Sequence, residues 1–138
     1  MMISTKGRYA LRIIIDLAQH SEEGFISLKE IAERQEISMK YLETIVSILN
    51  KARLVKSMRG KDGGYMLVKP ASEYTIGSII HATEGGLTPV SCLDCAQDQV
   101  CERADCCLTL PMWQKLDKLI SGFLDSISVA DLLNGKID

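Results

Sequence analysis

The segment that most constrains the fold is residues 25–55, FISLKEIAERQEISMKYLETIVSILNKARLV. Within it, Ser27 followed three residues later by Glu30 forms a capping box, which predicts a short helix over residues 28–35. Ser38 can cap a second helix, because apolar residues recur after it at helical spacing. These apolar positions are Leu42, Ile45, Val46 and Leu49. Two helices joined by a three- or four-residue turn predict a helix-turn-helix.

A glycine-rich hairpin is predicted directly after the second helix. Residues 54–58, LVKSM, alternate as a strand does, and residues 65–68, YMLV, return along it. The turn between them contains GKDGG, in which glycines supply positive φ angles. Arg59 and Lys61 fall at the tip of this hairpin. A helix-turn-helix followed at once by a basic hairpin predicts a winged helix, so we expect a mainly α fold with a small β-hairpin wing.

Further helices are predicted on either side of this unit. Ser4 or Thr5 can cap a first helix that begins near Lys6. After the hairpin, Thr75 can cap a helix that stops at the two glycines of residues 85–86. The apolar side of the first helix is expected to hold Leu11, Ile14, Ile15 and Ala18.

One long helix is predicted to dominate the C-terminal third of the chain. Thr109 and Pro111 suit an N-cap and an early helical position, and Ser128 with Asp131 opens a last short helix. The long helix carries a broad apolar stripe of Trp113, Leu116, Ile120, Phe123, Leu124 and Ile127. This stripe is wider than an uncovered tail needs, so we expect a second copy of the chain to cover it as a homodimer.

Charge divides the chain into two unequal halves. Residues 1–70 hold twelve Lys and Arg against eight Asp and Glu, whereas residues 71–138 hold four against ten. The first half therefore suits a polyanion and the second does not. We divide the chain into a winged helix-turn-helix DNA-binding domain, residues 1–70, and a second part, residues 71–138, with a cysteine loop and the dimerisation helices.

Several classes of protein are not supported by the sequence. No apolar run approaches the roughly 18 residues of a membrane span, and the start has no signal-peptide cleavage site. We therefore expect a cytoplasmic protein without a membrane partner. There is no nucleophile–base pairing, and GKDGG lacks the lysine–serine ending of a phosphate-binding loop. We expect neither an enzyme nor a small-molecule substrate.

Double-stranded DNA is the expected partner, because the second helix of a helix-turn-helix enters the major groove. Lys40 suits a phosphate or a guanine, Glu43 can accept a hydrogen bond from cytosine, and Arg59 can enter a minor groove or hold phosphates. The alternative is a merely solvated helix face. The capped turn, the basic hairpin and the charge division together favour an operator-binding surface. Its predicted residues are Lys6, Arg8, Ser38, Lys40, Tyr41, Glu43, Thr44, Arg59 and Lys61.

All five cysteines lie within residues 92–107, CLDCAQDQVCERADCC. In a reducing cytoplasm, clustered thiols indicate metal or redox chemistry before structural disulfides. Three interpretations stay open: a [2Fe–2S] cluster on three cysteines and a fourth group, a four-thiolate zinc site, or a metal-free thiol switch. The acidic residues among the cysteines are expected to raise thiol pKa values, which favours a metal over a lone reactive thiolate. The cysteines are Cys92, Cys95, Cys101, Cys106 and Cys107.

Three stretches of the chain resemble a known family of winged-helix transcription factors. They are ISTKGRYALR, ISMKYLETIVSILNKARLVKSMRGKDGGYML and CCLTLPMWQKLDKLISGFLDSISVADL. The family is that of the iron–sulfur cluster regulator IscR, with the cysteine-metabolism repressor CymR and the nitric-oxide-sensing repressor NsrR among its relatives. The resemblance implies a homodimer in which a long helix, residues 111–126, crosses to the partner. It also implies a [2Fe–2S] cluster on Cys95, Cys101 and Cys107.

The chain departs from this family at the fourth ligand of the cluster. In IscR-like proteins a histidine follows the third cysteine by three positions, and here that position is Leu110. Cys92 is the first candidate for the missing ligand and Cys106 the second, with a residue from the partner's N-terminal helix as a further alternative. The implied function is a DNA-binding repressor whose cluster senses iron–sulfur, redox or nitric oxide status. The alternative is a metal-free or zinc-binding regulator of sulfur metabolism that acts through thiol oxidation or a partner protein.

Overall fold

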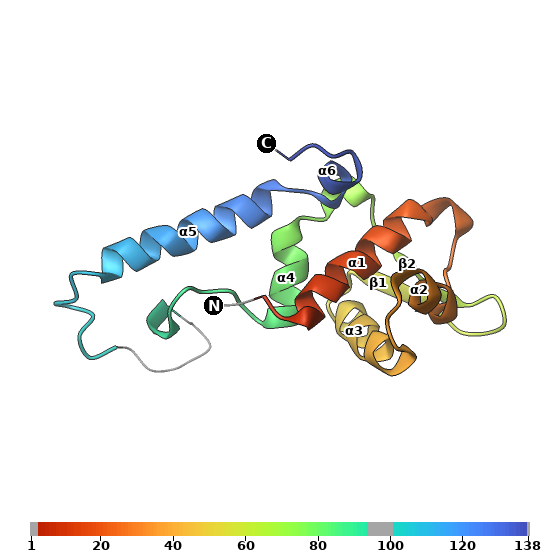
Figure 1. Cartoon of the computed structure of the whole chain (residues 1–138), viewed down its shortest axis with the longest axis horizontal. Helices are drawn as coiled ribbons and strands as arrows, with labels where there is room; N and C mark the ends of the chain where they lie inside the picture. Colours follow the sequence, from red (N-terminus) through yellow and green to blue (C-terminus); the bar gives the residue numbers. More distant parts are fainter. Residues whose placement is uncertain (1–2, 94–100, 138) are drawn as a thin grey trace.

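The computed structural model describes residues 3–93 and 101–137. Figure 1 shows α1 to α4, the hairpin and α6 gathered together, while α5 extends away from them. The mainly helical fold with one small antiparallel hairpin is confirmed within this part of the chain. Short 3₁₀ turns lie at Ser21–Glu23, Ala71–Glu73 and Ser91–Leu93. In chain order the helices and strands are α1 (Thr5–Gln19), α2 (Leu28–Gln35), α3 (Met39–Lys51), β1 (Val55–Met58), β2 (Gly64–Leu67), α4 (Ile76–Glu84), α5 (Leu110–Ser126) and α6 (Val129–Leu133).

Side-chain caps fix where most of these helices begin, as the sequence predicts. The Ser27–Glu30 capping box is formed in both directions, and α2 spans the predicted residues. Thr109 occupies the N-cap position of α5, but its hydroxyl makes no capping hydrogen bond. The other predicted caps are formed by Ser4 on α1, Ser38 on α3, Thr75 on α4 and Ser128 with Asp131 on α6.

Helix α1 lies at the centre of the core and contacts α2, α3, α4, α6 and β2. The predicted apolar side of α1 is wrong in part, since only Ile14 of the four expected residues is fully buried. The buried side is rotated toward Ile13 because α2, α3, α4, α6 and β2 all pack on α1 and together cover a wider strip than one neighbour would. Leu11, Ile15 and Ala18 are only partly buried. The fully buried apolar residues of α1 are Ala10, Ile13, Ile14 and Leu17.

The hairpin is short and is held to the rest of the fold along β2. Strands β1 and β2 pair from Val55 opposite Leu67 to Met58 opposite Gly64. On its other edge, Tyr65 exchanges two backbone hydrogen bonds of 2.8 Å with Ile26, in the segment that precedes α2. Gly64 permits this contact, because a Cβ atom there would lie 2.1 Å from the Ile26 carbonyl oxygen. The hairpin is therefore anchored beside the helix-turn-helix.

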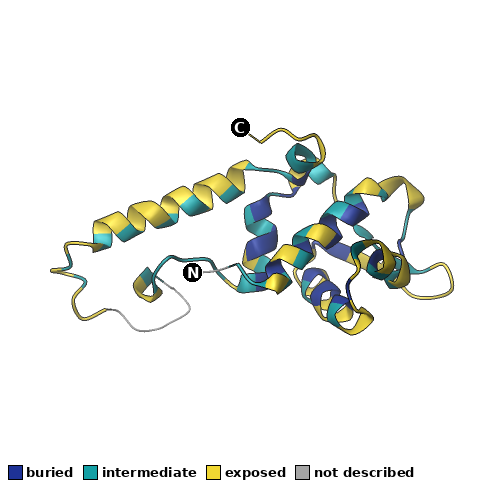
Figure 2. Ribbon diagram, viewed as in Figure 1, coloured by how far each residue is buried: buried dark blue, intermediate teal, exposed yellow. Residues whose placement is uncertain are grey.

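Helix α5 has no buried residue among those described. Figure 2 shows it as the most exposed helix, coloured mainly as exposed from end to end. The predicted apolar stripe is present, but only Leu124 and Ile127, near its C-terminal end, pack against the core. The exposed large apolar side chains of α5 are Met112, Leu116, Leu119 and Phe123.

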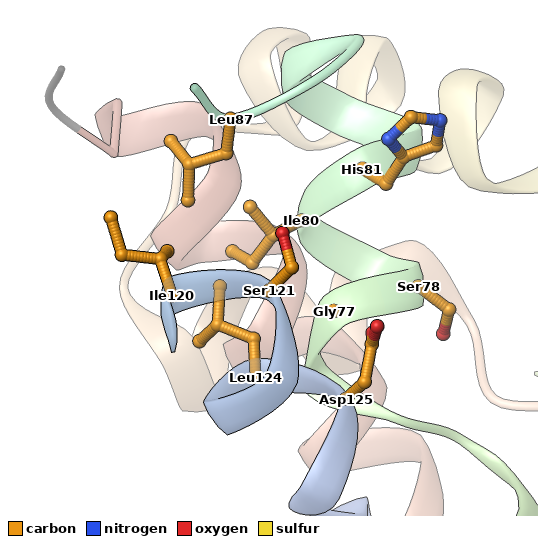
Figure 3. A pocket seen from close by; sticks show the side chains of 9 residues that line it. All are labelled: Gly77, Ser78, Ile80, His81, Leu87, Ile120, Ser121, Leu124 and Asp125. Carbon is orange, nitrogen blue, oxygen red and sulfur yellow. The ribbon is translucent and has the colours of Figure 1, made fainter. Parts of the chain in front are cut away.

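Where α5 meets α4, the two helices and Leu87 line an open pocket of about 270 Å³. Figure 3 shows Ile80 on α4 toward Ile120 and Leu124 on α5, with Gly77 beside Asp125. A Cβ atom at Gly77 would lie 1.9 Å from the Asp125 Oδ1 atom, so the glycine allows the close approach of α5 to α4.

Within residues 3–93 and 101–137, no helix has both the length and the apolar character needed to span a bilayer.

Replacing Gly64 with alanine should destabilise the fold, because its φ of 156° disfavours a side chain and the new methyl group would collide with the Ile26 carbonyl. We expect Gly64→Ala to lower the free energy of unfolding by roughly 2–4 kcal/mol, measured by urea unfolding at fixed protein concentration. Gly60→Ala is the control, since Gly60 has a φ of 116° but no neighbouring atom within 4 Å. Equal losses in both variants would show that backbone strain alone, and not the contact with Ile26, requires the glycine.

Candidate nucleic-acid interface

The turn between α2 and α3 has the geometry that a helix-turn-helix needs. Glu36 ends α2 in the left-handed conformation, with φ 54° and ψ 46°. Ile37 follows and is 5% exposed, so the turn is pinned to the core by one apolar side chain. The Ser38 hydroxyl then accepts a hydrogen bond of 3.3 Å from the Tyr41 backbone N–H and starts α3. The direction of α3 is therefore set by local contacts at its first turn.

The outer face of α3 carries most of the predicted DNA-contacting residues of this helix. Lys40, Glu43 and Thr44 are exposed, and the Thr44 hydroxyl donates to the Lys40 carbonyl oxygen at 3.1 Å. Tyr41 differs, because it is half-buried and its ring meets the Tyr9 ring edge-on at 5.7 Å between centroids. Tyr41 thus also holds α3 against α1.

Two further residues share this outer face and were missed by the sequence reasoning. Met39 is 43% exposed, and Ser47 is exposed one helical turn beyond Glu43. The spacing of residues 39, 43 and 47 at four-residue intervals is the signal that could have found them. The exposed face of α3 is therefore wider than the predicted set.

An ion pair between the buried Asp16 and the partly exposed Arg34 holds α2 against α1. Asp16 is 1% exposed, and the Arg34 guanidinium donates to both of its carboxylate oxygens, at 3.0 and 2.7 Å. The Gln35 amide donates a third hydrogen bond to Asp16, at 2.9 Å. Arg12 in turn donates to the side chain and to the backbone carbonyl of Gln35. These contacts fix the last turn of α2, directly before the turn that leads to α3.

The electrostatics of this pair follow from its surroundings. Burial acts to raise the pKa of Asp16, but hydrogen bonds from Arg34 and Gln35 and the charge of Arg34 outweigh it, so the pKa is held below its ordinary value. Sequence reasoning did not single out either partner. The available signal was an acidic residue inside the apolar run IIIDLA of α1, since an isolated charge in a buried helix face requires a partner.

The other predicted basic residues lie on the hairpin and at the start of α1. Arg59 and Lys61 are exposed in the loop between β1 and β2, as predicted, and Lys56 on β1 is exposed as well. Arg8 is exposed and donates a hydrogen bond of 3.1 Å to the Thr5 hydroxyl, whereas Lys6 is half-buried. Figure 1 shows the hairpin loop and α3 in the same half of the molecule, away from the extended part of α5.

The cysteine segment connects the end of α4 to the start of α5. Cys92, Cys101 and Cys106 are exposed and Cys107 is half-buried, and all four are free thiols. Cys95, the remaining predicted ligand, lies outside the described residues. Among residues 3–93 and 101–137, no group of three His, Cys, Asp or Glu side chains is close enough to hold a metal ion.

The pKa of one thiol in this segment, that of Cys107, differs from the prediction made from the sequence. The Thr109 hydroxyl lies 3.3 Å from the Cys107 sulfur, in place of capping α5. Hydrogen bonds from the hydroxyl and backbone of Thr109 lower the pKa of Cys107, where acidic neighbours were expected to raise it. The expectation fails there because a directional donor contacts the sulfur, whereas the surrounding carboxylates act through solvent.

A capped helix-turn-helix with an exposed polar face, followed by a basic hairpin, defines a winged-helix DNA-binding protein. A sequence model of the Rrf2 family, described as iron-dependent transcriptional regulators, matches residues 3–135. The chain therefore belongs to the Rrf2 family of transcriptional regulators and is not an enzyme.

Individual relatives agree with this assignment along the whole chain. The transcriptional regulator IscR of Serratia proteamaculans is 43% identical over 136 residues, covering 99% of this chain and 81% of the relative. The solved structure of IscR from T. potens is 39% identical with a TM-score of 0.76, covering 99% of this chain and 89% of that one. The solved structure of CymR, the global cysteine regulator of B. subtilis, is 40% identical with a TM-score of 0.78, covering 100% of this chain and 99% of that one. The predicted family resemblance is confirmed.

Asp16→Asn keeps the shape of the side chain but removes the charge that Arg34 pairs with. We expect the free energy of unfolding at pH 7 to fall by about 2 kcal/mol, a loss limited by the partial exposure of Arg34. Because the pKa of Asp16 is lowered in the folded state, this wild-type advantage is present above the ordinary carboxyl pKa and disappears as the pH falls through the folded-state pKa.

Urea unfolding from pH 7 down to pH 2 measures this difference. Asp62→Asn, in the exposed hairpin loop, is the control and should match the wild type at each pH. A deficit in Asp16→Asn that persists unchanged at pH 2 would show that the charge of Asp16 is not what stabilises the contact.

Proposed function

We propose that this chain is a homodimeric repressor that binds a double-stranded DNA operator through α3 and the wing, under the control of an iron–sulfur cluster on its cysteine segment. The observation that carries the proposal is the exposed polar face of α3 beside an anchored basic hairpin, in a member of a transcriptional regulator family. We also propose a cytoplasmic site of action, because a regulator of transcription must reach chromosomal DNA.

The proposed DNA contacts divide by chemistry. Lys40 binds a phosphate or guanine, and Glu43 accepts a hydrogen bond from a cytosine amino group, so this part of α3 reads bases in the major groove. Arg59 enters the minor groove or holds phosphates, because the wing extends beyond the recognition helix. The remaining basic residues, Lys6, Arg8 and Lys61, hold the DNA backbone. Ser38, Tyr41 and Thr44 lie at the N-cap and in the first turns of α3, which face the DNA.

A second copy of this chain is the proposed cover for α5. Its exposed apolar side chains include Leu119, which is 62% exposed, and Phe123, which is 54% exposed. Exposure of such an apolar stripe to water is energetically unfavourable, and packing against the same helix of a second copy would bury it. The proposed division at residues 70 and 71 is then one of function and not of packing, because α4 and α6 share one core with α1.

The donor chemistry of the cysteine segment fits an iron–sulfur cluster. Its described thiols are free and mostly exposed, and thiolates are the usual protein ligands of such clusters. We propose Cys95, Cys101 and Cys107 as ligands of a [2Fe–2S] cluster, with Cys92 as the fourth ligand and Cys106 as its alternative. When bound, the cluster supplies a redox-sensitive centre that oxidation or nitric oxide can destroy.

The chain itself supplies the link from this segment to DNA binding. The segment runs from α4, which packs on α1 in the DNA-binding half, to α5, the proposed dimer helix. A change of order in the segment therefore biases the position of α5 relative to α4, and with it the spacing of the two DNA-binding heads in the dimer.

A second candidate is a metal-free regulator of sulfur metabolism. It is favoured by the similarity to CymR, which is described as a global cysteine regulator and matches this chain over its full length. The iron-dependent description of the family and the IscR relatives support the cluster-bound regulator more strongly. The two candidates differ in bound metal.

Arg59→Ala should weaken operator binding. It should also make the negative slope of log affinity against log salt concentration less steep by about one, because one phosphate contact is lost. Glu43→Ala should relax base preference more than it weakens binding to unrelated DNA. Fluorescence anisotropy over a salt series, with operator and scrambled duplexes, measures both. Lys136→Ala, an exposed lysine in the C-terminal tail, is the control. Wild-type binding by both test variants would mean that the assigned DNA face is wrong.

Protein purified without air should contain iron and acid-labile sulfide and show the visible absorption of a [2Fe–2S] centre. Removal of the metal by a chelator should change operator affinity, because the cysteine segment loses its order. Cys101→Ser and Cys107→Ser should lose the iron, and comparison of Cys92→Ser with Cys106→Ser identifies the fourth ligand. A colourless protein with zinc or without metal would contradict the cluster and favour the second candidate, with DNA binding retained.

A further inference from the structure

One buried hydroxyl contacts both ends of the wing. Tyr74 is 0% exposed and lies between the hairpin and α4 in the sequence. Its hydroxyl donates a hydrogen bond of 2.5 Å to the carbonyl oxygen of Leu54, the residue directly before β1. The same oxygen accepts a hydrogen bond of 3.0 Å from the backbone N–H of Val68, the residue directly after β2. A single atom therefore ties together the two points at which the wing leaves the fold.

The chemistry of these two contacts requires a hydroxyl. A carbonyl oxygen can only accept and a backbone N–H can only donate, so the group between them must both donate and accept. Burial raises the pKa of Tyr74, although hydrogen bonds from Val68 and Lys69 oppose the shift, so the hydroxyl keeps its proton. Phenylalanine would keep the ring in place but leave Leu54 and Val68 without this partner.

The backbone of the same residue joins the wing to the C-terminal helices. The Tyr74 carbonyl oxygen accepts a hydrogen bond of 2.9 Å from the N–H of Val129, at the start of α6. Ile76, two residues further along the chain, donates a hydrogen bond of 2.9 Å from its backbone N–H to the carbonyl oxygen of Ile127, directly after α5. The side chain and the main chain of Tyr74 thus connect the base of the wing to the junction of α5 and α6.

We propose that Tyr74 is the positioning residue that sets the direction of the wing toward DNA. The inference rests on the proposed function in one respect, namely that Arg59 and Lys61 contact DNA. A hairpin of two four-residue strands is too small to hold its own orientation. The bridge between Tyr65 and Ile26 anchors one edge of β2, and the Tyr74 hydroxyl holds the two chain ends at the base. At about 3.3 Å per residue the hairpin extends roughly 13 Å, so a rotation of about 10° at its base moves the tip by about 2 Å. Such a displacement is enough to break a hydrogen bond to DNA.

The test is a double-mutant cycle on operator affinity. Tyr74→Phe in the full-length protein should weaken operator binding roughly fivefold to tenfold, within the range of one lost polar contact. In an Arg59→Ala, Lys61→Ala background, the same change should weaken binding less than about twofold, because the groups that Tyr74 positions are gone. Tyr65→Phe is the matched control, since it removes the same atom from a residue inside the hairpin whose hydroxyl has no hydrogen bond within the described residues.

The outcomes separate this inference from the proposed interface. If Arg59→Ala, Lys61→Ala weakens binding but Tyr74→Phe does not, the role of Tyr74 is wrong and the wing contact stands. If Tyr74→Phe weakens binding equally in both backgrounds, it acts by general destabilisation and the inference also fails. If the double variant binds like the wild type, the wing contact itself is wrong and the inference falls with it.

Hydrogen exchange in the wild-type protein gives a second test that needs no variant. The Val68 amide should exchange more slowly than the amides of residues 59–63, because it donates to a buried oxygen. Exchange of Val68 as fast as that of the hairpin loop would show that the hydroxyl does not hold the base of the wing in solution, and would overturn the proposal.

Discussion

The burial of α1 is the constraint on which the rest of the structure depends. Four of its apolar residues, Ala10, Ile13, Ile14 and Leu17, are at most 1% exposed, and α2, α3, α4, α6 and β2 all pack on the helix. Apolar burial of this kind stabilises the fold in proportion to the area removed from water, but it is non-directional. It brings the helix-turn-helix and the C-terminal helices onto one core and leaves their exact orientations to other contacts.

Polar contacts supply those orientations. Asp16 and Arg34 fix the end of α2 against α1, the Ser38 hydroxyl fixes the first turn of α3, and the Tyr74 hydroxyl fixes the base of the wing. Each is directional, and each lies at a point from which a DNA-binding element extends. A winged helix has a small core, so a few hydrogen bonds at such points have a large influence on the surface that faces DNA.

The second half of the chain has the opposite character. Helix α5 has no buried residue within the described part, and the segment before it carries thiols that the core excludes. An exposed apolar helix and exposed thiols are the two features behind the proposed second copy of the chain and the proposed metal centre. Both features lie in the half of the chain that is joined to the DNA-binding half through the contact of α4 with α5.

The sequence by itself determined where the helices and strands lie, because caps and periodicity act within about four residues. The Ser27–Glu30 box, Ser38, Thr75 and the glycine-rich hairpin all predicted elements at the right positions. The sequence also determined the family, since its motifs span the whole chain.

Only the tertiary structure decided which surfaces and side chains meet. The buried side of α1 includes Ile13 because α2, α3, α4, α6 and β2 all pack on this helix, and the Thr109 hydroxyl contacts the Cys107 sulfur and does not cap α5. Asp16 pairs with a residue 18 positions away and Tyr74 with one 20 positions away, distances at which no local signal operates. Such pairs depend on how the helices cross, and the crossing is set by the packing of the whole core.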